Sequence, residues 1–127
     1  MNVKLGGKKL DYSKVHIVLE AGPTHTGIES AKRLVDQALK AGADSVKFQM
    51  VDTDRLMATG QNVDFEYSYL EKDEKGNEVF KKFSEPLSDI LKRRSLSKKE
   101  WIELKKYCDN KGIHFFTTAS YFDEVDF

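Results

Sequence analysis

Residues 16–27 read HIVLEAGPTHTG, and this stretch decides the fold that the sequence predicts. The run 16–21 is rich in β-branched and aliphatic side chains, and both of its faces are apolar, which is typical of a buried strand in a parallel sheet. From 29 to 41 the apolar residues recur at helical spacing, and Gly42 supplies a stop signal. A strand that leads into an amphipathic helix indicates the start of a parallel β-α-β unit.

Two further strands are predicted, at 45–49 (SVKFQ) and at 113–118 (IHFFTT). Their order with the helices implies parallel β-α-β units with right-handed crossovers. We expect the first three βα units of a TIM-type (β/α)₈ barrel, truncated, although a small open α/β sheet fits the same pattern. Ser120 or Asp123 is placed to cap one more helix, which has barely begun at Phe127.

Two segments lie outside these units. Residues 1–14 carry a hairpin signal, because Gly6 and Gly7 separate two short alternating runs. Residues 52–95 are predicted to form an insertion between the second strand and the following helix, with a hairpin that turns near 73–77. The insertion has too few apolar residues for a separate domain, so we expect a single partial barrel over 1–127.

The helix that precedes the third strand carries clear start signals. Ser97 and Glu100 have the spacing of a capping box, and Leu96 can pack against Trp101 as a hydrophobic staple. Cys108 falls on the buried face of this helix, with no cationic neighbour placed by spacing. An inert core thiol is therefore expected rather than a nucleophile.

Composition excludes several classes of protein. The 127 residues suit one globular unit, and 21 Lys and Arg balance 21 Asp and Glu, so no net charge favours nucleic acid or an anionic membrane surface. No apolar run approaches the about 18 residues of a membrane span, and the amino terminus lacks the apolar core of a signal peptide. A single cysteine cannot form an intrachain disulfide. We expect a cytoplasmic protein.

Polar side chains stand at the carboxyl ends of the predicted strands, where parallel α/β folds bind their ligands. Glu20 ends the first strand, Lys47 and Gln49 the second, and Thr118 the third. Lys47 and Gln49 are two residues apart, so both point to one side of the sheet. A lysine and an amide that project together can bind an anionic substrate, and the neighbouring carboxylate can pair with that lysine or bind a hydroxyl.

Each of these residues also has a purely structural interpretation. Glu20 and Lys47 could form no more than a buried ion pair. His25, in a turn rich in glycine, could be a loop residue that forms hydrogen bonds rather than a ligand or a base. None of the three histidines is spaced with another as a metal-ligand pair, so we expect no metal site within this chain.

Taken together, the motifs resemble the amino-terminal part of the sialic acid (N-acetylneuraminate) synthase family. The family pattern Glu-x-Gly-x-Asn-His-x-Gly resembles EAGPTHTG at 20–27, and its Gly-Ala-Asp followed by Val-Lys-Phe-Gln resembles GADSVKFQ at 42–49. Residues 96–118 look like its Leu-Ser helix, Lys-Gly-Ile turn and Ser-Thr-Pro strand end. The similarity extends from about Val15 to Phe127 and is interrupted by the insertion.

The resemblance implies a barrel that condenses phosphoenolpyruvate with an N-acylmannosamine-type sugar and releases phosphate. Glu20 would face the sugar and the reacting centre, and Gln49 would line the site close to the metal, as the catalytic pair. Lys47 would neutralise phosphoenolpyruvate, Thr118 would contact it, and His25 would complete the substrate-binding set. A fixed ammonium opposite an anion whose charge redistributes during reaction is the kind of preorganised electrostatics that lowers such barriers.

The resemblance also implies a divalent metal, Mn²⁺ or Mg²⁺, that polarises the sugar aldehyde, and a homo-oligomer. The family's metal-binding histidines and its antifreeze-like domain lie beyond the counterpart of Phe127. We therefore expect a fragment that does not turn over substrate alone. Thr24 and Ala119 replace the family's Asn and Pro. Two alternatives remain: another phosphoenolpyruvate-dependent sugar-acid synthase, or a non-catalytic partial barrel that assembles through exposed strand edges.

Overall fold

The computed structural model describes residues 3–5, 8–11, 13–57 and 63–127. The chain divides into two compact units, one formed by Met1–Val51 with Arg94–Phe127, the other by Asp52–Arg93. The second unit ends two residues short of the predicted insertion 52–95. Its role as an insertion within one domain stays a prediction.

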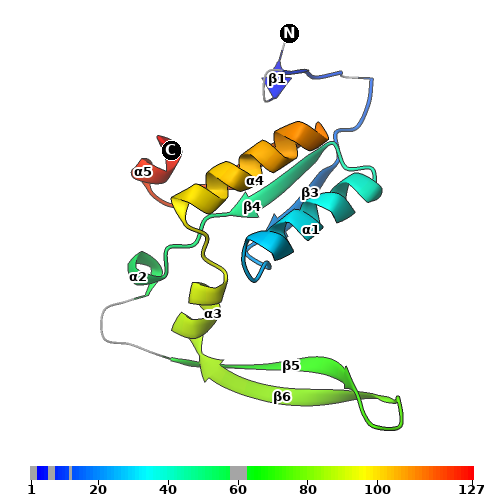
Figure 1. The fold of residues 1–127 in the computed structure, drawn as a ribbon, viewed down its shortest axis with the longest axis vertical. Helices are drawn as coiled ribbons and strands as arrows, with labels where there is room; N and C mark the ends of the chain where they lie inside the picture. The colour runs from blue at the N-terminus through cyan, green and yellow to red at the C-terminus, as the bar shows by residue number, and fades with distance from the viewer. Residues whose placement is uncertain (1–2, 6–7, 12, 58–62) are drawn as a thin grey trace. The chain divides into compact units, whose positions relative to one another are not determined.

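The first unit is built on a parallel sheet of three strands: β3 (Val18–Gly22), β4 (Ser45–Gln49) and β7 (His114–Thr118), in the order β3-β4-β7. Helix α1 (Ile28–Lys40) connects β3 to β4, as Figure 1 shows, and helix α4 (Lys98–Lys111) precedes β7 in the chain. The prediction of an α/β fold with a parallel sheet is confirmed. The full barrel stays a prediction.

The hydrophobic core lies between this sheet and the two helices. Every core side chain belongs to the strand face turned toward α1 and α4 or to the facing side of those helices and their loops. The buried members of the cluster are Ala21, Ala31, Val35, Ala38, Val46, Phe48, Met50, Leu96, Trp101, Leu104, Cys108 and Ile113. Helical spacing of apolar residues and strand alternation together produce this single layer.

Within the first unit, helices α1 and α4 both pack on the core face of the sheet, so neither helix covers the opposite face, which we call the uncovered face. Val18 is 42% exposed and Glu20 is also exposed, so the prediction that the first strand is buried on both faces is wrong. The strand begins at Val18 rather than at His16, and its register with β4 shifts between Glu20 and Gly22. Alternating burial is what a sheet with helices on one side produces.

Helix α4 begins and ends as predicted. The Ser97 hydroxyl accepts a hydrogen bond from the Glu100 amide at 3.3 Å, and the Glu100 carboxylate accepts one from the Ser97 amide at 2.8 Å. Gly112 ends the helix in the left-handed conformation, with φ of 75°. Leu96 and Trp101 are both buried in the core, as the staple requires.

The prediction for the last helix, α5 (Phe122–Val125), is wrong in its cap. Tyr121 occupies the N-cap position rather than Ser120 or Asp123. The Glu124 carboxylate accepts hydrogen bonds from the amides of Ser120 at 2.6 Å and Tyr121 at 3.2 Å. The carboxylate of a helix residue thus satisfies the amides at the N-cap and just before it, while the Glu124 amide donates to the Tyr121 carbonyl at 3.0 Å.

Polar side chains join α1 to α4 above the core. The Tyr107 hydroxyl donates to the Asp36 carboxylate at 2.9 Å, and Lys111 pairs with Asp36 at 3.1 Å. Lys32 of α1 pairs with Glu103 of α4 at 2.7 Å. Hydrogen bonds from Lys111 and Tyr107 lower the pKa of Asp36.

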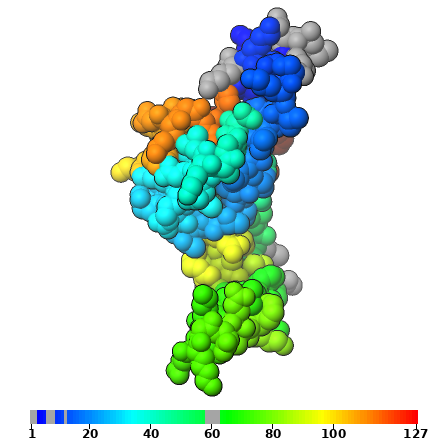
Figure 2. All heavy atoms as spheres, turned by 90° about the vertical axis from the view of Figure 1, so that its right-hand side faces the viewer, coloured from blue at the N-terminus to red at the C-terminus, as the bar shows by residue number. Residues whose placement is uncertain are grey.

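The second unit is a hairpin with two short helices. Strand β5 (Asp64–Lys72) pairs antiparallel with β6 (Glu78–Pro86), flanked by α2 (Thr53–Leu56) and α3 (Leu87–Arg93). The turn falls where the sequence predicts it, because the Asp73 amide donates to the Asn77 carbonyl at 2.9 Å. Large apolar side chains of this hairpin, green in Figure 2, are exposed: Phe65, Leu70 and Phe80.

The amino-terminal ribbon consists of β1 (Lys4–Leu5) and β2 (Lys8–Lys9), which pair antiparallel. The pairing agrees with the predicted hairpin, but Gly6 and Gly7 lie outside the described residues. No helix within the described part of the chain is long and apolar enough to cross a membrane.

Candidate active site

Lys47 and Gln49 of β4 lie on the same side of the sheet. Val46 and Phe48, which alternate with them, are fully buried on the helix side, at 0% exposure. Successive side chains of a strand point to opposite faces, so Lys47 and Gln49 project from the uncovered face, where both are half-buried. The geometry expected from their spacing is confirmed.

Glu20 lies directly opposite Lys47 on the neighbouring strand. The Lys47 ammonium donates a hydrogen bond to Glu20 Oε2, and the Gly22 amide donates one to Glu20 Oε1 at 2.9 Å. The Lys47 side chain is 29% exposed and that of Glu20 is 53% exposed. The ion pair therefore forms but is not buried, which corrects the structural interpretation of this pair.

Thr118 joins the same group from β7. It is the register partner of Gln49, and Phe116 is the partner of Lys47. Directly paired residues of neighbouring strands share a face. Glu20, Lys47, Gln49 and Thr118 therefore form one group of polar side chains on the uncovered face of the three strands, which we call the polar face. Phe116 adds an aromatic side chain beside Lys47.

The structure does not bring His25 into the polar face. Its ring is fully buried on the helix side of the sheet, with ring centroids 6.0 Å from Phe48 and 6.1 Å from Trp101. Neither ring nitrogen has a hydrogen-bond partner among the described residues. Burial, assisted by the positive charge of Arg94, lowers the pKa of His25. This geometry favours neither the loop hydrogen bond that the residue pattern suggests nor the direct substrate contact that the resemblance implies.

Gly22 and Phe116 are the parts of this site that sequence reasoning did not single out. Gly22 has φ of 53°, a left-handed conformation that favours glycine, and its amide donates to Glu20 Oε1. A glycine two residues after a strand-end carboxylate was the available signal for that hydrogen bond. Only the strand register reveals Phe116.

Neither a reactive thiol nor a metal-ligand cluster is found among the described residues. Cys108 is fully buried, and burial raises the pKa of its thiol to about 12, so the thiol stays protonated at neutral pH. Within the described residues, no three His, Cys, Asp or Glu side chains are grouped so as to hold a metal ion. The residues present therefore do not fit the divalent metal that the resemblance implies.

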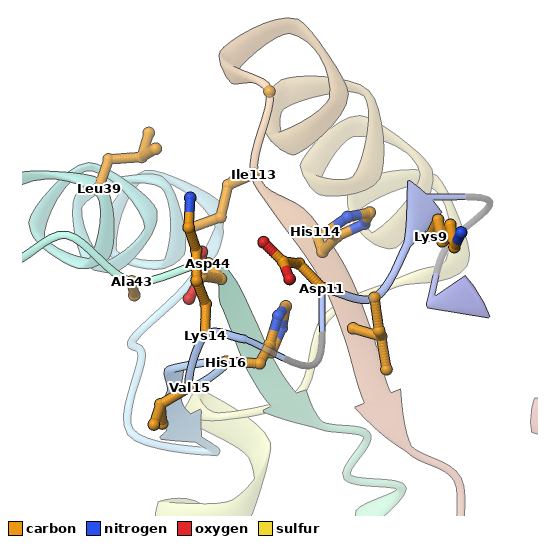
Figure 3. A pocket seen from close by; sticks show the side chains of 12 residues that line it. Lys9, Asp11, Lys14, Val15, His16, Leu39, Ala43, Asp44, Ile113 and His114 are labelled. Atoms are coloured by element: carbon orange, nitrogen blue, oxygen red, sulfur yellow. The ribbon is translucent and has the colours of Figure 1, made fainter. Parts of the chain in front are cut away.

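A pocket of about 320 Å³ lies at the amino-terminal ends of the strands, at the opposite end from the polar face (Figure 3). There His16 Nε2 lies 2.6 Å from the Ser45 hydroxyl. Its charged and titratable lining consists of Lys9, Asp11, Lys14, His16, Asp44 and His114. Because two lysines face two aspartates, the lining has no excess charge that selects an ionic ligand.

Comparison with known proteins places these features in a family. A sequence model of the NeuB family matches residues 34–127. The N-acetylneuraminate-9-phosphate synthase of Drosophila melanogaster is 31% identical, over 98% of this chain and 30% of its own length. The N,N'-diacetyllegionaminic acid synthase of Legionella pneumophila is 33% identical, over 99% of this chain and 33% of its own length. The chain thus spans about a third of the curated relatives it matches.

The fold has a counterpart among solved structures. One is the crystal structure of N-acetylneuraminic acid synthetase from Leptospira borgpetersenii in complex with citrate. The superposition covers 99% of this chain and 36% of the synthetase chain. The TM-score is 0.68 and the sequence identity 23%, so this likeness shows the fold alone. The family match includes Lys47, Gln49 and Thr118, and the relatives' alignments extend over almost the whole chain. The chain belongs to the NeuB family.

Proposed function

We propose that this chain supplies the first three βα units of the catalytic barrel of a nonulosonic (sialic) acid synthase. The reaction condenses phosphoenolpyruvate with an N-acylmannosamine-type sugar. C3 of phosphoenolpyruvate forms a bond to the aldehyde carbon of the open-chain sugar, water adds at C2, and the C2–O bond breaks to release phosphate. Membership of the NeuB family and names of relatives that are sugar-acid synthases support this reaction class.

The observation that carries the proposal is the polar face. Four polar side chains from three neighbouring strands, Glu20, Lys47, Gln49 and Thr118, share one side of the sheet toward the strands' carboxyl ends. In parallel α/β folds that end of the sheet binds the ligand. The opposite face is filled by the apolar core, so only this face is available for polar recognition.

Lys47 is the residue we assign to phosphoenolpyruvate. Glu20 is its only hydrogen-bond partner among the described residues, so the ammonium keeps donors for a substrate anion. An ion pair as exposed as this one contributes about 0 to 1 kcal/mol to stability. Fold stability therefore does not account for a lysine in the central strand of the sheet, whereas binding of an anion does.

Glu20, Gln49 and Thr118 have complementary roles in the proposal. Glu20, held by the Gly22 amide, faces the sugar and the reacting centre. Gln49 offers an amide to the sugar, and Thr118, its register partner, offers a hydroxyl to phosphoenolpyruvate. The described residues contain no ligand set for the divalent metal of the family, so no step assigned to these four side chains uses it.

The test is phosphate release from phosphoenolpyruvate with N-acetylmannosamine and Mn²⁺. The assay compares the 127-residue chain with the longest reading frame that contains it. We expect release only from the longer protein. In that protein Lys47→Ala should lower kcat/KM for phosphoenolpyruvate by about 10-fold or more, the loss of one charge-assisted contact.

Lys99→Ala is the matched control, because Lys99 is exposed in the first turn of α4, away from the polar face. It should leave kcat/KM unchanged. Equal activity of the Lys47→Ala variant and the unaltered protein would rule out the assigned role of Lys47. Release of phosphate by the 127-residue chain alone would contradict the proposal that it is only part of the site.

A further inference from the structure

His25 is packed into a cluster of three aromatic rings. Its centroid lies 6.0 Å from that of Phe48 and 6.1 Å from that of Trp101, and the Phe48 and Trp101 centroids are 6.2 Å apart. All three side chains are at most 5% exposed. The ring of His25 thus packs against Phe48, which lies between Lys47 and Gln49 on β4 and points to the other side of the sheet.

The nitrogens of this ring do not explain its position. Neither Nδ1 nor Nε2 of His25 has a hydrogen-bond partner among the described residues. A buried polar group without a partner costs stability and calls for an explanation. Because the ring makes aromatic contacts and no hydrogen bonds there, its shape rather than its proton chemistry is what the surrounding side chains use.

A short turn connects this ring to the polar face. The Gly22 amide donates to Glu20 Oε1 at 2.9 Å on one side of the sheet. The Thr24 hydroxyl donates to the Ala21 carbonyl at 2.7 Å, which closes the turn between Gly22 and His25. The loop 21–27 is therefore attached at both faces, through Glu20 on the polar face and through His25 in the core.

We propose that His25 is a positioning residue of the polar face: its ring, packed against both Phe48 and Trp101, fixes the loop that directs the Gly22 amide at Glu20. Glu20 in turn accepts a hydrogen bond from the Lys47 ammonium. His25 acts on Lys47 through this chain of contacts and touches neither substrate. The inference rests on the proposed function only in treating Glu20 and Lys47 as the reacting site.

The first test measures geometry without turnover. Hydrogen exchange of the Gly22 amide is followed by NMR in the 127-residue chain, beside global stability from urea unfolding. In His25→Ala, exchange of the Gly22 amide should accelerate by about 10-fold or more beyond the acceleration of the central β4 amides, because the loop loses its core anchor. Acceleration equal to that of β4 would overturn the proposal.

Two variants separate positioning from general loss of packing. Val35→Ala removes volume from the same core at a fully buried position of α1, so it should accelerate Gly22 and β4 exchange equally. His25→Phe keeps an aromatic ring without unpaired nitrogens, so Gly22 exchange should stay within about 3-fold of the unaltered chain. Loss of Gly22 protection in a folded His25→Phe chain would overturn positioning by shape.

The second test applies the same variants to the longer protein. His25→Ala should lower kcat with a smaller effect on KM for phosphoenolpyruvate, and His25→Phe should restore kcat to within about 3-fold. Equal kcat in His25→Ala and the unaltered protein would overturn the proposal. If the unaltered longer protein releases no phosphate, the proposed reaction fails, while the exchange data still decide whether His25 orders the loop.

Discussion

Lys47 shows how one residue can be half-buried in a central strand and still be available to a ligand. Its neighbours Val46 and Phe48 anchor the strand in the core, while the ammonium forms a hydrogen bond only with Glu20 among the described residues. Glu20 is held from its other side by the Gly22 amide. The pair is thus oriented by the backbone rather than by other charges, and a bound anion can compete for Lys47 without disrupting the core.

His25 makes the stability of the chain depend on pH. Burial, with the positive charge of Arg94 and against the opposing effect of Glu100, lowers its pKa below the ordinary value of about 6.5. The folded state then binds fewer protons than the unfolded state near that pH. The stability that the neutral ring contributes is complete above about pH 6.5 and is lost as the pH falls through that value toward the lower folded pKa.

Urea unfolding at pH 7.5, 6.5 and 5.5 checks this. The unaltered chain should lose more stability on acidification than His25→Phe, by at most about 1.4 kcal/mol per pH unit below pH 6.5. Carboxylates such as Asp36 are protonated by acid in both proteins, so their effect on stability cancels when the two proteins are compared. If the free energy of unfolding changed with pH in the same way in both proteins, the pKa of His25 would not be lowered by folding.

At the scale of elements, the start of α4 is the feature with the clearest energetic consequence. Ser97 and Glu100 satisfy each other's backbone amides. Ser97→Ala should lower the free energy of unfolding by about 1 kcal/mol, because the helix loses its cap. The shift of the urea midpoint measures this loss. Lys99→Ala, in the same exposed turn, should change stability by less than about 0.5 kcal/mol.

The elements were predictable wherever local chemistry decides them. Strand β4 matches its predicted range, and α1 begins and ends one residue before the predicted limits of 29 and 41. Failures occurred where the local pattern does not decide, because the outcome depends on a distant element or on one particular side chain. The burial of β3 depends on which face the helices cover, and the cap of α5 depends on a carboxylate that reaches back to the chain before the helix.

The candidate site was predictable to a similar extent. Alternation along a strand placed Lys47 and Gln49 on one side, and parallel pairing brought Glu20 and Thr118 beside them. The position of His25 was not predictable, because a loop residue beside glycines can point to either face of the sheet. The packing of the His25 ring against Trp101, a residue distant in the sequence, decides which face of the sheet the ring occupies.

For the whole first unit, the uncovered face of the sheet is the main physical problem. Strands β3 and β7 stand at its edges within the described residues, and Val18 is 42% exposed on the same side as Glu20. Unpaired strand edges and exposed apolar side chains favour association with another surface. In the proposed synthase that surface is the remainder of the barrel. In the isolated chain, a second copy is the available partner.

We therefore expect the 127-residue chain to self-associate as its concentration rises, measured by sedimentation velocity. Val18→Lys should weaken association by placing a charge on the uncovered face, with little loss of monomer stability because the side chain is already exposed. Val79→Lys is the matched control, since Val79 of β6 is also 42% exposed but belongs to the other unit. If both substitutions weaken association equally, contact is not specific to the sheet. If neither does, the uncovered face is not where copies meet, and the exposed strand edges remain as the surface through which a partial barrel would assemble.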